Sequence, residues 1–117
     1  RILGFVNAPT LQQKVVKACL DEKTDISFYD RNRETLYNGL KELGFECIKP
    51  EGAFYLFVKS PVADEKEFCA AAKKYNILIV PGSSFACPGY VRIAYCVAYE
   101  TIVNSLPKFA ELAGEYR

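Results

Sequence analysis

The sequence predicts an α+β domain in which a small, mostly antiparallel or mixed sheet carries helices packed on it. Helix-like and strand-like segments follow one another in the order strand, helix, helix, strand, strand, helix, strand, strand, helix. Short connections within residues 45–58 and 77–97 favour antiparallel pairing of the strands they join. The chain has 117 residues, 50% of them hydrophobic and 14% aromatic, which suffices for one domain with one core.

The first two predicted elements are a strand and a helix. Residues 2–6 form an apolar run that is typical of a short strand. Thr10 and Gln13 stand three positions apart, which is the spacing of a capping box at the start of a helix. The apolar residues that follow share one helical face. They are Leu11, Val15, Ala18 and Cys19.

A longer helix is predicted over about residues 29–43, after a polar break at residues 21–28. Its leucines repeat at helical spacing, and Gly44 stands where a helix end favours glycine. Residues 45–49 are predicted to form a short strand. Residues 53–58 are continuously apolar and aromatic, which predicts a strand covered on both faces.

The second half of the chain predicts two more helices and two more strands. Asp64 opens a helix whose buried stripe follows helical spacing. That stripe comprises Phe68, Ala71, Ala72 and Tyr75. Residues 77–80 and 90–97 are predicted strands. The last helix, over residues 100–116, contains Pro107, which predicts a kink or a restart at that position.

Charge and composition argue against several classes of protein. A net charge of +1 disfavours a large nucleic-acid footprint, and no apolar run approaches the roughly 20 residues of a membrane span. The chain has no His, so the commonest general base and metal ligand is missing, and no metal site is predicted. Its 5 cysteines form no C-x-x-C pair, which favours small buried thiols in a reducing, cytoplasmic setting.

Arg92 is the residue most indicative of function. It is the one charge in the predicted strand 90–97, and no acidic residue lies near it in sequence. Strand alternation places it on one face with Tyr90, Ala94 and Cys96, opposite Val91, Ile93, Tyr95 and Val97. Burying an unpaired charge is costly, and a planar guanidinium suits a carboxylate. Three hypotheses for Arg92 follow from these observations. It binds a small anionic ligand, it points to water from an edge strand, or it pairs with a distant Glu.

The other candidate residues favour structural roles. Residues 82–84 are expected to form a plain turn rather than a polar ligand-binding loop. Phe54, Tyr55 and Phe57 are expected in the core, because no basic residues interleave them as in a base-stacking platform. Residue chemistry alone thus predicts a ligand-facing arginine on a small domain without a catalytic centre.

Several segments resemble, in order and spacing, the small C-terminal domain of class I/II aminotransferases. These are the fold-type I enzymes that use pyridoxal phosphate, aspartate aminotransferase among them. Residues 50–57 (PEGAFYLF), 79–85 (IVPGSSF) and 89–95 (GYVRIAY) resemble three of their motifs. The run beginning at Arg1 is similar to the "RxGF" segment after the cofactor lysine, with two residues in place of one before the Gly. Ala86 stands where the family mostly has Gly.

The resemblance implies roles for two residues. Arg92 would hold the substrate α-carboxylate, and Arg1 would bind the cofactor phosphate. The Schiff-base lysine is expected upstream of Arg1, so no catalytic residue is assigned to this chain. Residues 1–8 would then be the last strand of a large domain that binds pyridoxal phosphate, and residues 9–117 the small domain. An opening Arg in place of Met, followed at once by apolar residues, also leads us to expect a piece of a longer protein.

The parent protein is therefore expected to be a homodimeric aminotransferase with pyridoxal 5'-phosphate as cofactor. It would move an amino group between an amino acid and a 2-oxo acid, and this chain alone would be inactive. A carbon–sulfur β-lyase or an aminocyclopropane-carboxylate synthase of the same fold is an alternative. A free-standing α+β ligand-binding or regulatory module, with Arg92 holding an effector carboxylate, is an alternative of another class.

Overall fold

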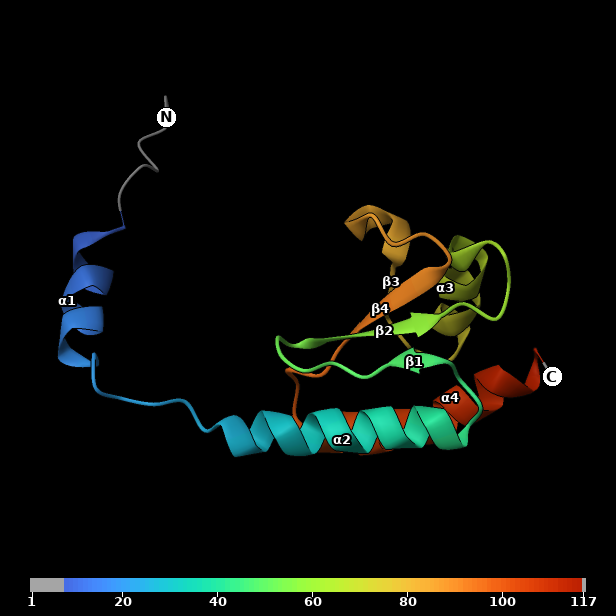
Figure 1. The fold of residues 1–117 in the computed structure, drawn as a ribbon, viewed down its shortest axis with the longest axis horizontal. Coiled ribbons are helices and arrows are strands. Elements are labelled where there is room, and N and C mark those ends of the chain that lie inside the picture. Colours follow the sequence, from blue (N-terminus) through green and yellow to red (C-terminus); the bar gives the residue numbers. More distant parts are fainter. Residues whose placement is uncertain (1–7, 117) are drawn as a thin grey trace, which may run out of the picture.

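A four-stranded antiparallel sheet forms the centre of the structure, a computed structural model that describes residues 8–116. Across the sheet the strands are β1 (Cys47–Ile48), β2 (Tyr55–Lys59), β4 (Tyr90–Ala94) and β3 (Val80–Pro81). Figure 1 shows the sheet above two long helices. The predicted α+β class and the antiparallel pairings are confirmed. The predicted strand over residues 2–6 lies outside the described residues.

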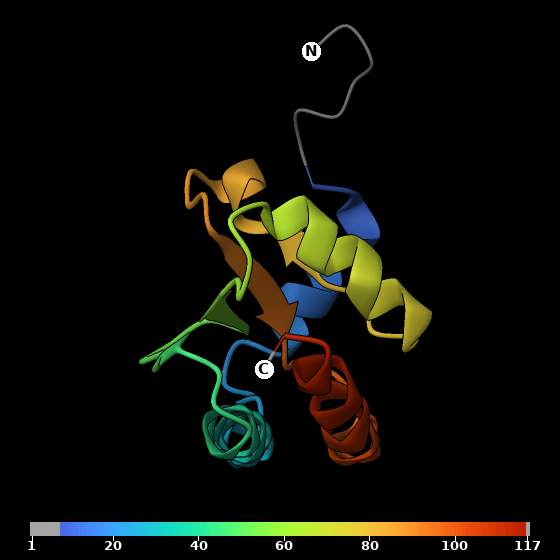
Figure 2. The ribbon, with the colours of Figure 1, turned by 90° about the vertical axis from the view of Figure 1, so that its right-hand side faces the viewer.

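Three helices cover one face of this sheet. α2 (Ile26–Glu42) and α4 (Tyr99–Gly114) lie side by side beneath it, and α3 (Glu65–Lys74) packs beside β3 and β4 (Figure 2). Each helix contributes side chains to one core. The core includes Leu36, Leu40, Phe68, Ala72, Ile102, Phe109 and Leu112, together with Leu56, Val58, Val91 and Ile93 from the sheet. The predicted stripes of α2 and α3 are therefore buried, although Tyr75 is only half-buried.

The opposite face of the sheet is open among the described residues. Leu56 and Val58 point into the core, whereas Tyr55 and Lys59 on the same strand are exposed. The prediction that residues 53–58 are covered on both faces was therefore wrong. Successive side chains of this segment point alternately to the core and to the open face of the sheet. Because those on the open face are aromatic, the sequence shows no alternation between apolar and polar residues.

The ends of α2 follow from its capping groups. The Asp25 side chain accepts a hydrogen bond from the Ser27 backbone N–H at 3.0 Å, so the helix begins three residues earlier than predicted. Gly44 ends it as expected, with a φ of 87°. The backbone N–H of Phe45 then donates to the Leu40 carbonyl at 3.0 Å, which completes a Schellman motif.

Two predicted strands of the second half are shorter in the structure. β3 comprises Val80–Pro81 rather than residues 77–80. β4 ends at Ala94 rather than Val97, because the Asn32 side chain on α2 donates to the carbonyls of Tyr95 and Val97 at 3.0 and 2.8 Å. These bonds tie the end of β4 to α2, while the Tyr95 backbone N–H still donates to the Phe54 carbonyl at 3.0 Å. α4 is assigned as one helix that runs through Pro107 rather than restarting there.

α1 (Thr10–Ala18) stands away from the sheet and the other helices (Figure 1). None of its residues is buried, and Leu11 on its apolar face is 69% exposed, so no described element covers that face. The capping box is also absent. Pro9 takes the N-cap position without a side-chain bond, and the Gln13 side chain donates to the Ala8 carbonyl at 2.6 Å. In the part of the chain described, no helix is both long and apolar enough to cross a membrane.

The cysteines differ in exposure but are all free thiols. Cys69 is buried, as predicted for a small core thiol, whereas Cys19 and Cys96 are exposed and contradict that prediction. Partial burial raises the pKa of the Cys47 thiol to about 11, which keeps it protonated and unreactive near neutral pH.

Candidate functional site

Arg92 lies on the open face of the sheet between two aromatic rings. Its Cζ atom is 4.1 Å from the ring centre of Tyr55 on β2 and 3.8 Å from that of Phe85. Phe85 ends η1 (Gly82–Phe85), a 3-10 helix that follows β3. Both contacts are short cation–π contacts, which hold a guanidinium in place without neutralising its charge. The side chain is therefore oriented but keeps its hydrogen-bond donors.

The two structural hypotheses for Arg92 do not match its surroundings. β4 is a central strand, since Arg92 stands opposite Phe57 of β2 on one side and Val80 of β3 on the other. The ion pairs found within residues 8–116 all involve other side chains, so no Glu neutralises Arg92 there. A half-buried, permanently charged group without an acidic partner is suited to bind an anion.

The aromatic residues around Arg92 were not predicted as part of a site. Phe54 and Tyr55 are exposed, and Phe57 is half-buried, so their assignment to the core was wrong. Phe54 packs on Tyr29 of α2 with ring centres 4.9 Å apart, whereas Tyr55 turns to Arg92. The pairing of β2 with β4 produces this arrangement. It is a long-range contact for which the local sequence carries no signal.

The loop between β3 and β4 brings Phe85 to Arg92. Gly82 is buried in it, and a Cβ atom at Gly82 would collide with the Cys87 carbonyl and lie 2.6 Å from that of Tyr90. Only glycine allows this close approach of the backbone. Ala86 follows Phe85 with a φ of 56°, in the left-handed region that favours glycine. The segment expected to be a plain turn is thus a tightly specified 3-10 turn.

Glu65 anchors the same loop from the start of α3. Its Oε2 atom accepts the Gly89 backbone N–H at 3.2 Å, and the Ser83 side chain also hydrogen-bonds to the carboxylate. The Ser83 bond, followed by that from Gly89, holds the pKa of Glu65 below its ordinary value. Sequence reasoning missed Glu65, because its partners lie far along the chain.

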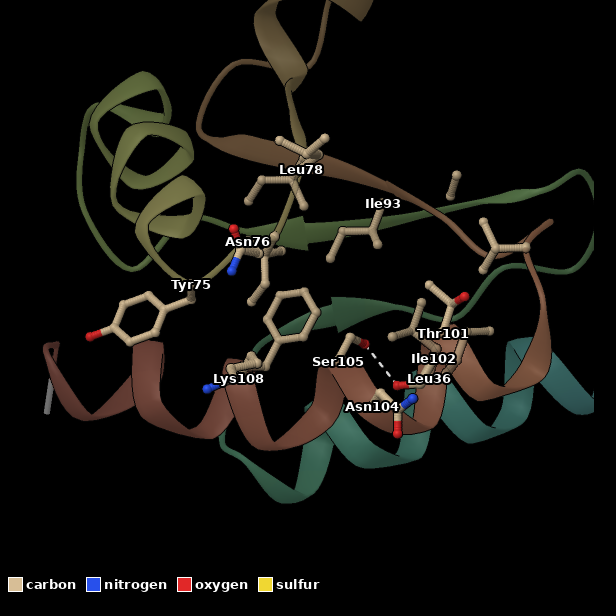
Figure 3. A pocket seen from close by; sticks show the side chains of 15 residues that line it. Leu36, Tyr75, Asn76, Leu78, Ile93, Thr101, Ile102, Asn104, Ser105 and Lys108 are labelled. Carbon is tan, nitrogen blue, oxygen red and sulfur yellow. Dashed lines mark hydrogen bonds between the residues drawn. The ribbon is translucent and has the colours of Figure 1, made fainter.

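A separate pocket of about 670 Å³ opens between α4 and the β3 side of the sheet (Figure 3). Its walls are mainly apolar, and Ile93 faces it from the side of β4 opposite to Arg92. The Ser105 hydroxyl donates to the Ile102 carbonyl at 2.7 Å, and Lys108 pairs with Glu111 at 2.9 Å. Ser105 and Lys108 are thus engaged locally, and Arg92 remains the better candidate for an anion site.

The lysines within this sequence do not offer a Schiff-base residue. Every lysine of the chain is described by the structure and exposed, including Lys14, Lys17, Lys41 and Lys73. None therefore offers the desolvated amine that Schiff-base chemistry needs. Arg1 lies outside the described residues, so its predicted contact with a cofactor phosphate stays a prediction.

Known proteins resemble this chain in both sequence and structure. The profile of the family described as aminotransferase class I and II matches residues 2–106. The aromatic-amino-acid aminotransferase 2 of Thermococcus litoralis is 34% identical to this chain. The match covers 90% of this chain and 30% of the length of that protein. The aspartate aminotransferase of Pyrococcus abyssi is also 34% identical, over 97% of this chain and 37% of its own.

Solved structures show the same relationship. The crystal structure of an amino transferase from Eubacterium rectale matches this chain with a TM-score of 0.88 and 46% sequence identity. The match covers all of this chain and 29% of the chain in that structure. The Thermus thermophilus aspartate aminotransferase with maleate matches 86% of this chain and 26% of its own, with a TM-score of 0.73 and 29% identity. The chain thus spans about a third of the length of the curated relatives it matches.

Proposed function

Because this chain belongs to the class I and II aminotransferase family, we propose that it forms the C-terminal small domain of a longer enzyme that uses pyridoxal 5'-phosphate. In this proposal Arg92 binds the α-carboxylate of the amino-acid substrate. The observation that carries the proposal is the charged Arg92 side chain on the open sheet face, flanked by Tyr55 and Phe85 without an acidic partner among the described residues.

The proposed reaction moves an amino group from an amino acid to a 2-oxo acid. When bound, the cofactor supplies the carrier that takes up the amino group from one substrate and gives it to the next. The part of Arg92 is to donate two parallel hydrogen bonds to the substrate carboxylate, which fixes the orientation of the amino acid. Tyr55 and Phe85 surround the guanidinium with apolar surface, and a lower local dielectric strengthens the ion pair.

The groups that hold the cofactor are proposed to lie mainly outside this sequence. The exposed lysines of the chain do not fit a Schiff base, so we place that lysine and the partner of the ring nitrogen in the large domain. Arg1 is proposed as a phosphate ligand on the sequence resemblance alone. Residues 1–8 are proposed to end the large domain, with residues 9–117 as the small domain.

The alternatives to transamination have less support. A carbon–sulfur lyase or an aminocyclopropane-carboxylate synthase would use the same carboxylate arginine, but the relatives reported above are named as aminotransferases. A free-standing module is disfavoured because those relatives are about three times as long as this chain. A homodimeric, cytoplasmic enzyme is proposed on the family resemblance and on the free state of the cysteines.

The proposal is tested on the full-length protein encoded by the gene that contains this sequence. The visible spectrum of the purified protein should show bound cofactor, and L-aspartate or L-phenylalanine should change that spectrum and yield a 2-oxo acid. Addition of a second 2-oxo acid should restore the starting spectrum. A protein that binds no cofactor, or that converts amino acids without forming a 2-oxo acid, contradicts the proposed function.

A further inference from the structure

One buried carboxylate holds both ends of the loop that carries Phe85. Glu65 is the first residue of α3 and is only 7% exposed. It binds Ser83 near the start of the loop and the Gly89 backbone N–H immediately before β4. The contacts therefore span the whole loop, at positions before and after Phe85.

The two anchors flank the part of the loop that contacts Arg92. Phe85 lies between the two tethered positions, with its ring 3.8 Å from Arg92 Cζ. Ala86 has a φ of 56°, a left-handed conformation that is unfavourable for a residue other than glycine, so other contacts must hold this turn. On its far side, the Gly89 carbonyl accepts the Ser60 backbone N–H at 2.9 Å.

Glu65 is not needed to start its own helix. Asp64 is the N-cap of α3 and accepts the Lys66 backbone N–H at 2.9 Å. The ion pairs within residues 8–116 leave Glu65 without a cationic partner. A buried carboxylate in this setting is stabilised by its hydrogen bonds, which are charge-assisted and directed at the loop.

We propose that Glu65 is a positioning residue for the carboxylate site. By binding Ser83 and Gly89 it sets the position of Phe85, and Phe85 in turn orients the Arg92 guanidinium. This inference rests on the proposed role of Arg92, and it adds a residue that touches neither substrate nor cofactor.

The test uses the full-length enzyme and pairs of substrates that differ in the α-carboxylate alone. L-phenylalanine is compared with phenethylamine, and L-aspartate with β-alanine, in single-turnover half-reactions followed by the cofactor spectrum. Glu65→Gln keeps the shape of the side chain but removes its charge and one acceptor oxygen. We expect the apparent KM for the amino acids to rise about tenfold, the order for loss of a hydrogen bond to a charged group. The amines should change less than twofold.

Three further variants keep the result decisive. Glu67→Gln alters an exposed carboxylate in the same helical turn and should behave as wild type. Ser83→Ala removes one hydrogen-bond donor to Glu65 at an exposed position. It should raise the KM for amino acids by a smaller factor, and it remains informative if Glu65→Gln does not fold. Arg92→Lys reports on the proposed function independently of Glu65.

The outcomes separate the two proposals. Suppose that Arg92→Lys impairs the reaction of amino acids more than that of amines, whereas Glu65→Gln and Ser83→Ala do not. The role of Glu65 is then overturned and that of Arg92 stands. If Arg92→Lys itself affects amino acids and amines equally, the proposed function of Arg92 fails. A selective rise in the KM for amino acids in Arg92→Lys, Glu65→Gln and Ser83→Ala, with Glu67→Gln unchanged, supports the positioning role.

Discussion

The Cζ atom of Arg92 lies 3.8 Å from the ring centre of Phe85, although the two residues belong to different elements of the fold. β4 fixes the backbone of Arg92 in the middle of the sheet, and the loop after β3 brings the ring over the side chain. A free arginine side chain would lose rotamer entropy on binding a ligand. Contact with Phe85 restricts that freedom beforehand, so the guanidinium is preorganised for a carboxylate.

Replacement of Phe85 should weaken substrate binding without removing the charge of Arg92. A cation–π contact contributes about 0.5–2 kcal/mol, so Phe85→Leu should lower kcat/KM for amino acids roughly 2- to 30-fold in the full-length enzyme. Phe54→Leu is the matched control, because Phe54 is 44% exposed against 43% for Phe85 but packs on Tyr29 instead. Equal losses in the two variants would show that the Phe85 contact is not specific.

Ala86→Gly should stabilise the protein. Ala86 has a φ of 56°, and relief of this conformation is worth about 1–2 kcal/mol, partly offset by the roughly 0.5–1 kcal/mol entropic cost of glycine. Urea unfolding of this chain should therefore show a net gain of up to about 1.5 kcal/mol. Ala110→Gly, at an exposed position in α4, is the control and should instead destabilise by about 1 kcal/mol. A loss of stability in both variants contradicts the assigned backbone conformation.

The hydrogen bonds of Glu65 predict a pH dependence of stability. The Ser83 side chain and the Gly89 N–H lower the pKa of Glu65 in the folded state below its ordinary value of 4.5. The folded state therefore gains stability from Glu65 above pH 4.5 and loses it as the pH falls through the lowered pKa. Urea titrations of this chain between neutral and acidic pH should show a shallower acid loss in Glu65→Gln than in Glu67→Gln. Identical pH profiles for the two variants argue against the buried anchor.

Local sequence patterns predicted the parts of the fold that depend on neighbours along the chain. The alternation of buried and half-buried residues in β4 follows from the two-residue repeat of a strand, and the spacing of the leucines in α2 from the helical repeat. The glycine after α2 follows from the left-handed backbone conformation at a helix end. Arg92 was identified for the same reason, as one charge in an apolar strand. These features are encoded within a few residues of one another.

The main errors concern contacts between distant segments. Residues 53–58, which include most of β2, are apolar or aromatic at every position, so no alternation in the sequence indicates which face of the strand is open. The capping box expected at Thr10 is absent, because Pro9 takes the N-cap position and the Gln13 side chain donates to the Ala8 carbonyl instead. Glu65 meets its loop across a long stretch of sequence, and only the packing of α3 beside β3 and β4 brings them together.

This chain alone should not bind pyridoxal phosphate at one specific lysine. Its lysines are all exposed and lack the desolvated setting that activates a Schiff-base amine. Incubation with the cofactor, followed by borohydride and peptide mass spectrometry, should give low, scattered labelling and no transaminase turnover. One stoichiometric site with turnover contradicts the placement of the cofactor lysine outside this sequence.

The comparison of wild type with Arg92→Lys in the full-length enzyme tests the central claim most directly. Lysine keeps the positive charge but cannot form the two parallel hydrogen bonds of a guanidinium. Loss of such a pair costs about 2–5 kcal/mol, so kcat/KM for L-phenylalanine or L-aspartate should fall by roughly one to three orders of magnitude. Phenethylamine and β-alanine should lose far less, and cofactor binding and Tm should change little. Equal losses for amino acids and amines, or unfolding of the variant, would contradict the assignment of Arg92 to the substrate carboxylate.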